Sequence, residues 1–172
     1  MKRLISVFVL CAFPILIYAQ SNPVMDAARD TLQRREKNLV EAAQEMPADE
    51  YGYKPTQAQM SFAHLVGHIA QSNGFLCSKI SGIAAPPQRV SDADPKTKLV
   101  DALKASFDFC STAFSQVGDA KLADEVTLFG GRKSTKAAAV IALTGDWADH
   151  YSAAAMYLRL NGLLPPTAKP KD

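Results

Sequence analysis

Apolar residues recur at helical spacing along four stretches of the chain. The first stretch begins at Asn22-Pro23, a pair typical of a helix start because Asn caps the first turn and Pro suits the first helical position. The pattern predicts an amphipathic helix that ends where Met46-Pro47 interrupts it. Its apolar positions keep a heptad-like spacing on a charged background: Met25, Ala28, Leu32, Leu39, Ala42 and Met46.

Two further helices follow on either side of a proline-rich segment. Ser61 is a favourable N-cap for a second helix that runs to about Ser81, and Asp94-Pro95 repeats the cap-plus-proline start for a third, which ends near Gly118. The segment 82–95 contains three prolines, so we expect no regular element there. The apolar positions of the two helices are Phe62, Leu65, Ile69 and Leu76, and then Leu99, Leu103, Phe107, Cys110, Phe114 and Val117.

The fourth helix is predicted from the cap residues Ser134-Thr135 to about Leu160, where Asn161-Gly162 ends it. The residues before it, 121–133, contain Gly130-Gly131 between two short runs that favour strands. They form either a short hairpin or an irregular loop, and the sequence leaves both open.

Four amphipathic helices of this length predict an all-α domain, a four-helix bundle. The connections 82–95 and 118–134 are long enough for crossovers, so a simple up-down-up-down order is not required. We place the bundle domain at residues 20–167, followed by a short polar tail at 168–172.

The first residues have the organisation of a secretory signal peptide. Lys2 and Arg3 form a basic start, residues 4–17 are apolar, and Ala19 offers a small residue before a cleavage site. The apolar run is short for a membrane span of about 20 residues and contains Pro14. We therefore expect residues 1–19 to be removed, the protein to be exported (periplasmic or secreted), and the mature form to lie outside the membrane.

Charge and cysteine content narrow the function classes. Removing Lys2 and Arg3 from the 19 basic residues leaves 17 against 17 acidic ones, without the basic patch that nucleic-acid binding requires. The mature chain keeps Cys77 and Cys110, and export permits a disulfide. If the second and third helices are parallel, these thiols lie at the same height along the bundle. If the helices are antiparallel, they lie far apart.

Three polar side chains lie on the apolar faces and are our candidate metal ligands. Asp146 and His150 are four residues apart, so they project side by side from the fourth helix, and His68 lies on the apolar side of the second. Imidazole and carboxylate groups suit a first-row divalent ion with open positions for water or substrate. Two alternatives remain: Asp146 and His150 satisfy each other without a metal, or His64 contributes a further imidazole.

Three segments resemble the DinB-like superfamily of four-helix bundles. They are the run from Tyr53-Lys54-Pro55-Thr56 to Phe62, the motif Leu65-Val66-Gly67-His68-Ile69-Ala70, and the stretch from Asp149-His150-Tyr151 to Pro165-Pro166. The resemblance covers nearly all of the mature chain. It implies up-down-down-up connectivity and a divalent metal, typically zinc or nickel, held by one His of the second helix and an His-x-x-x-His pair of the fourth.

His68 and His150 match two of these three positions, and Asp146 stands where the first His of the pair would be. A set of two His and one carboxylate would also suit iron or manganese.

We therefore expect an exported metal-dependent transferase or hydrolase that acts with a small thiol or another small substrate. The alternative is a bundle that binds a metal or a small ligand without catalysing a reaction. An open coordination position beside a cavity would favour the enzyme. The partner expectations also include a homodimer.

Overall fold

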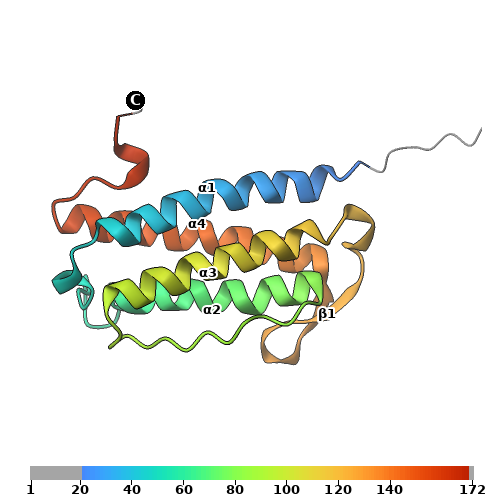
Figure 1. Cartoon of the computed structure of the whole chain (residues 1–172), viewed down its shortest axis with the longest axis horizontal. Coiled ribbons are helices and arrows are strands. Elements are labelled where there is room, and N and C mark those ends of the chain that lie inside the picture. The colour runs from blue at the N-terminus through green and yellow to red at the C-terminus, as the bar shows by residue number, and fades with distance from the viewer. Residues whose placement is uncertain (1–20, 171–172) are drawn as a thin grey trace, which may run out of the picture.

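Four long helices account for most of residues 21–170, the part of the chain that the computed structural model describes (Figure 1). They are α1 (Pro23–Glu45), α2 (Phe62–Ser81), α3 (Lys96–Ser115) and α4 (Lys136–Leu160). Short 3-10 turns occupy Ala48–Glu50, Asp119–Lys121, Phe129–Gly131 and Pro166–Ala168. The signal peptide expected over residues 1–19 lies outside the described residues.

The hairpin alternative for the segment before α4 is the one that the structure contains. Strands β1 (Glu125–Thr127) and β2 (Lys133–Thr135) pair antiparallel, with Val126 opposite Ser134. Thr135 then caps α4 by accepting a hydrogen bond from the backbone N–H of Ala138 at 3.2 Å, as its position predicts.

The start of α1 is capped by Asp119, a residue of the turn that follows α3. Asn22 occupies the cap position, but its side chain accepts the backbone N–H of Asp119 at 2.8 Å instead of capping its own helix. The Asp119 carboxylate in turn accepts the N–H groups of Val24 and Met25, each at 2.9 Å. This exchange joins the start of α1 to the turn after α3.

The boundaries of α3 differ from the sequence prediction. The helix begins at Lys96 and ends at Ser115, inside the predicted limits of Pro95 and Gly118. Asp94 does not cap it, because its carboxylate accepts the Ser91 N–H at 2.8 Å and the Lys98 ammonium at 2.9 Å. The acidic side chain therefore closes a turn in the connection before the helix.

The connectivity is up-down-down-up, as the family resemblance implies. Asn73 of α2 forms a hydrogen bond with Ser106 of α3, and Cys77 forms a disulfide with Cys110. Both pairs are separated by 33 residues, and such a constant separation along two helices means that α2 and α3 are parallel. The connection 82–95 makes this possible by returning the chain along the length of α2 (Figure 1).

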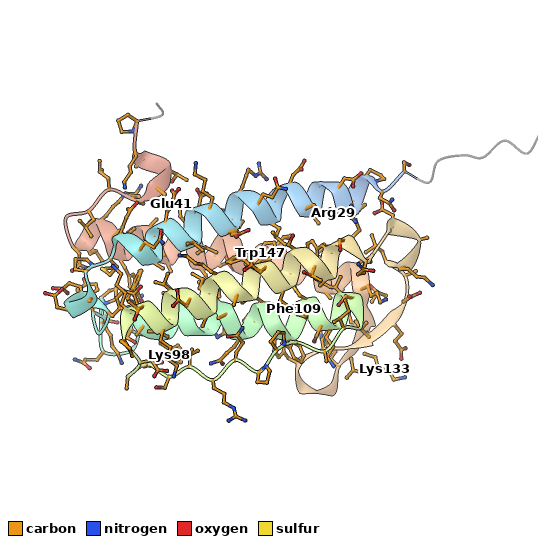
Figure 2. The ribbon with its side chains drawn as sticks, in the orientation of Figure 1. Arg29, Glu41, Lys98, Phe109, Lys133 and Trp147 are labelled. Atoms are coloured by element: carbon orange, nitrogen blue, oxygen red, sulfur yellow. A yellow bond between two sulfur atoms is a disulfide. The ribbon has the colours of Figure 1, made fainter. Side chains whose placement is uncertain are left out.

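The apolar faces predicted from the sequence form one core between the helices, in which Trp147 of α4 is central (Figure 2). Its side chain is fully buried, and its indole Nε1–H donates to Oδ1 of Asn73 on α2 at 2.6 Å. The Asn73 amide donates to Ser106 Oγ on α3 at 2.9 Å. One buried asparagine therefore fixes the height of α2 against both neighbouring helices.

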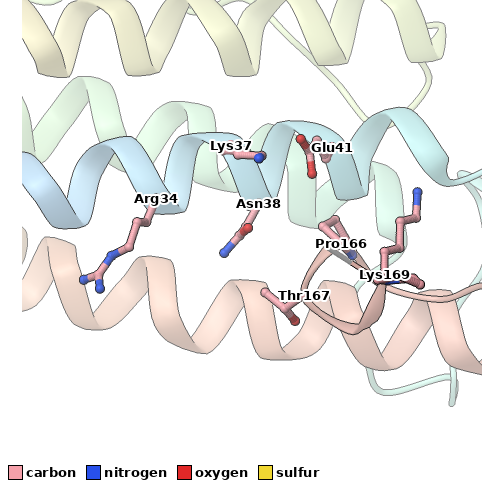
Figure 3. Close-up of a pocket in the computed structure, with 8 residues that line it drawn as sticks. Arg34, Lys37, Asn38, Glu41, Pro166, Thr167 and Lys169 are labelled. Atoms are coloured by element: carbon pink, nitrogen blue, oxygen red, sulfur yellow. The ribbon is translucent and has the colours of Figure 1, made fainter. Parts of the chain in front are cut away.

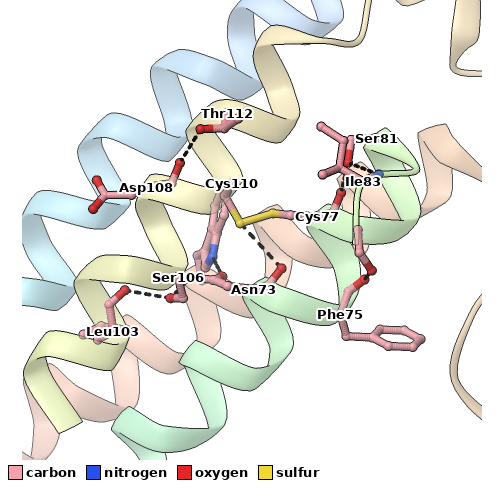
Figure 4. Close-up of a disulfide and its surroundings, with 12 residues drawn as sticks. Asn73, Phe75, Cys77, Ser81, Ile83, Leu103, Ser106, Asp108, Cys110 and Thr112 are labelled. Atoms are coloured by element: carbon pink, nitrogen blue, oxygen red, sulfur yellow. Dashed lines mark hydrogen bonds between the residues drawn. A yellow bond between two sulfur atoms is a disulfide. The ribbon is translucent and has the colours of Figure 1, made fainter. Parts of the chain in front are cut away.

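The Cys77–Cys110 disulfide lies one turn from this asparagine and is fully buried (Figure 4). The two Cα atoms are 5.3 Å apart, within the range that a disulfide spans without backbone movement. Of the two arrangements considered from the sequence, the parallel one with adjacent cysteines is therefore correct.

The segment after α4 packs back onto the bundle. Tyr151 donates its hydroxyl hydrogen to Thr167 Oγ1 at 2.8 Å and accepts the Thr167 N–H at 3.0 Å, while Lys169 pairs with Glu45 of α1 at 2.6 Å. The described part of the predicted polar tail is therefore attached to α1 through Lys169, and the residue just before the tail, Thr167, is attached to α4. None of the helices in residues 21–170 combines the length and apolar character that a bilayer crossing requires.

Breaking the disulfide should destabilise the fold without changing it. Closing a loop of this sequence separation removes unfolded-state entropy equivalent to about 3–4 kcal/mol. We expect reductant to lower the free energy of unfolding by roughly this amount, measured by denaturant titration. The Cys77→Ala/Cys110→Ala double variant is the control, since its unfolding should not respond to reductant. Equal midpoints for the oxidised and reduced wild type would contradict the prediction.

Replacing Asn73 should destabilise the bundle more than replacing an exposed neighbour on the same helix. Asn73→Leu leaves the Trp147 N–H buried without an acceptor, which costs about 1–3 kcal/mol. Gln71→Leu is the matched control because Gln71 is exposed on α2. Chemical unfolding of both variants tests this, and an equal loss of stability would show that the Asn73 bonds contribute nothing.

Candidate metal centre

His68 of α2 converges with Asp146 and His150 of α4 in the structure. Each residue offers one ligand atom, and these atoms all lie within 4.8 Å of one another. The side chains are partly buried, with exposed fractions of 21% for Asp146 and 14% for His150. The structure therefore brings together the three residues that the sequence pattern indicated as candidate ligands.

The imidazole of His150 is held in one tautomer by its own helix. Its Nδ1 lies 2.7 Å from the backbone carbonyl oxygen of Asp146, and 3.3 Å from Oδ1 of the Asp146 side chain. Because a carbonyl oxygen can only accept, Nδ1 carries the hydrogen, so that the neutral ring has its lone pair on Nε2. Metal-binding histidines are typically oriented in this way.

His68 faces His150 across the gap between α2 and α4, with ring centroids 4.8 Å apart. Its Nε2 lies 3.3 Å from Ser72 Oγ, one turn further along α2. Burial lowers the pKa of His68 below its usual value, and the neighbouring His150 acts in the same direction. The ring is therefore predisposed to the neutral form, which is the form that binds metals.

Asp146 is the least satisfied of the three groups. Its Oδ2 is the one buried side-chain nitrogen or oxygen in residues 21–170 that has no hydrogen-bond partner. Burial raises the pKa of this carboxyl above its usual value, although the attraction of His150 and His68 opposes the shift. A buried oxygen that lacks a donor, beside two imidazoles, fits a cation held by all three groups.

The other aromatic and histidine residues near the site have separate roles. His64 Nδ1 pairs with Asp92 of the 82–95 connection at 3.1 Å, and its side chain is 51% exposed. This contact leaves His64 outside the three-ligand group, so the sequence alternative of a further imidazole is not what the structure shows. Trp147 and Tyr151 are buried in the core, where they act as packing residues.

A cavity of about 330 Å³ adjoins His150 of the candidate ligand group. His150 contributes to its wall, together with Met60 before α2 and Met156 of α4. A larger groove, of about 670 Å³, lies between α1 and the C-terminal segment, with Arg34 and Thr167 among its lining residues (Figure 3). We assign the chemistry to the smaller cavity because His150, one of the three candidate ligands, lines it.

Two residues near the candidate ligands, Ser72 and Met60, were not predicted from the sequence. Ser72 follows His68 by four positions, a spacing that places the two side chains on one helix face and could have identified the contact. Met60 carried no comparable signal, since it lies in the loop before α2 and reaches the cavity only through the tertiary fold.

Comparison with known proteins agrees with this architecture. A DinB-like protein from Bacillus subtilis is 25% identical and has a TM-score of 0.67, with 84% of this chain and 99% of that chain covered. A DinB-like protein from Bacillus cereus is 12% identical, with a TM-score of 0.69 and coverage of 82% and 95%.

A mutant of a mycothiol-dependent maleylpyruvate isomerase shares the fold at 13% identity and a TM-score of 0.62, over 74% of this chain and 59% of that chain. No protein of curated function matches the sequence. The family model of the DinB superfamily matches residues 31–153, which is well over half of the sequence. The chain therefore belongs to the DinB superfamily.

Proposed function

We propose that this protein binds one divalent metal ion through His68, Asp146 and His150 and uses it in a reaction of a small molecule. The observation that carries the proposal is the convergence of three ligand atoms within 4.8 Å, together with the buried, unpartnered Oδ2 of Asp146. Three protein ligands leave coordination positions open, which is typical of catalytic and not of structural metal sites.

A divalent ion at this position would act as a Lewis acid that favours deprotonation of a thiol or a water molecule. The chain's own residues prepare the site for this role. The Asp146 carbonyl orients His150, while burial lowers the pKa of His68 and so favours the neutral ring. The adjoining cavity gives a small substrate access to the same place.

The mycothiol-dependent relative supports a thiol among the substrates. A transferase that activates a small thiol and a hydrolase that activates water would both use this ligand arrangement, so the resemblance to the superfamily is consistent with either reaction. The family resemblance favours zinc or nickel, whereas the carboxylate of Asp146 extends the range to iron and manganese.

Export to the periplasm or the medium remains part of this proposal. The signal-peptide pattern at residues 1–19 motivates it, and the Cys77–Cys110 disulfide supports it because disulfides persist mainly in oxidising compartments.

The mature protein should contain close to one divalent ion per chain. His68→Ala and His150→Ala should each lose the ion while keeping the helical fold, because a two-ligand site binds far more weakly. His64→Ala is the matched control and should retain the ion, since Asp92 holds that ring outside the group. Elemental analysis after purification, with circular dichroism for the fold, measures both. Full metal content in the first two variants would contradict the site.

Asp146→Asn should weaken metal binding and stabilise the metal-free protein. Burial raises the Asp146 pKa from 3.8, so the folded state holds the proton where the unfolded chain has lost it. The metal-free wild type therefore loses stability as pH rises through this window, whereas the asparagine variant does not. At pH 7 in chelator we therefore expect the asparagine variant to have the higher free energy of unfolding.

The same variant should bind zinc at least about tenfold more weakly, because it loses a charged ligand. Zinc titration and denaturant unfolding in chelator supply the two measurements. A variant that is less stable without metal, and equally tight for zinc, would assign Asp146 a purely structural role.

A further inference from the structure

The cavity beside His150 has a mainly apolar wall. Leu65 of α2 is buried behind it, while Met60 and Met156 line its opening with exposed fractions of 39% and 47%. Methionine side chains are flexible and polarisable, so they adapt to apolar ligands of different shape. The wall therefore favours a ligand with an apolar body.

The side of the cavity next to the loop is fixed in place by Tyr157. Its hydroxyl donates to the backbone carbonyl of Met60 at 3.0 Å, and its ring packs edge-on against Tyr53 with centroids 6.0 Å apart. These contacts attach the loop before α2 to α4, so the two methionines belong to a defined wall and not to a free loop.

The cavity has one carboxylate in its lining. Asp149 is the one acidic side chain in its lining, and neither lysine nor arginine contributes to the lining within the described residues. Asp149 directly precedes His150 and is exposed to solvent.

We infer that the substrate of this site is a small molecule with an apolar body and an uncharged or positively charged polar end, and that Asp149 excludes anions. This inference rests on the proposed function, because it assigns the substrate class of the same metal centre. The larger groove near α1 has a basic excess, since Arg34, Lys37 and Lys169 line it against the single carboxylate of Glu41. Anionic probes are therefore expected to prefer that groove.

The methionines provide a direct measurement of where a probe binds. Met60 and Met156 line the cavity, whereas Met25 and Met46 are fully buried in the core and serve as internal controls. Mature protein with 13C-labelled methionine methyl groups is titrated with hexyltrimethylammonium, hexanol or hexanesulfonate, once in chelator and once loaded with zinc. The divalent ion itself attracts anions, so the series in chelator reports the charge of the lining alone. We expect the signals of Met60 and Met156 to shift with the first two probes, and the cationic probe to bind about fivefold more tightly than the sulfonate.

Substitutions at Asp149 test its role without changing a proposed metal ligand. Asp149→Asn should reduce the preference for the cation, and Asp149→Lys should reverse it, while the matched control Asp101→Asn on α3 should leave it unchanged. A wild type in which the sulfonate shifts Met60 and Met156 at equal or lower concentration than the ammonium probe would overturn the inference. A preference that persists in Asp149→Lys would overturn it as well.

Failure of the proposed function is recognised separately. The zinc content of each sample is measured, and the titrations are repeated with His68→Ala. Bound zinc without the charge preference contradicts the substrate class alone. A chain that binds no zinc, yet keeps the charge preference in both proteins, supports the Asp149 selectivity and contradicts the metal-dependent reaction.

Discussion

A carboxylate oxygen buried without a hydrogen-bond partner is the constraint on which this site depends. An unsatisfied buried polar atom costs about 1–3 kcal/mol, and a fold keeps such an atom at low cost only if something else satisfies it. The two imidazoles beside Asp146 do not meet this need, because burial still raises its pKa. A cation shared by His68, Asp146 and His150 would satisfy this oxygen, because its positive charge offsets the cost of burying the carboxylate and is coordinated by both imidazoles as well.

The remaining structure serves to bring α2 and α4 together at the correct height. Trp147, the residue after Asp146, bonds to Asn73, which lies just over one turn beyond His68. Asn73 also bonds to α3, and the Cys77–Cys110 disulfide fixes the same pair of helices one turn away. Because α2 and α3 are parallel, the chain needs the long connection 82–95. Asp92 of that connection pairs with His64 and holds its ring outside the ligand group.

Local patterns in the sequence were sufficient for the helices and for the ligand group, whereas contacts across the fold were not. The apolar faces and the four-residue spacing of Asp146 and His150 are local properties, and the structure confirms them. The cap that Asp119 provides for α1 joins residues 95 positions apart, so no local pattern contains it. Asp94 was wrongly expected to cap α3 because its competing partner, Lys98, lies one turn inside the helix. The cavity likewise depends on how Met60 meets α4.

The most direct measurement of the central claim is the position of a bound ion in a crystal structure of the zinc-loaded mature protein, located by anomalous scattering. The account predicts one strong peak at about 2.0–2.2 Å from a nitrogen of His68, a nitrogen of His150 and an oxygen of Asp146. Zinc bound at His64 and Asp92 instead, or an Asp146–His150 pair that stays hydrogen-bonded with no peak beside it, would contradict the account.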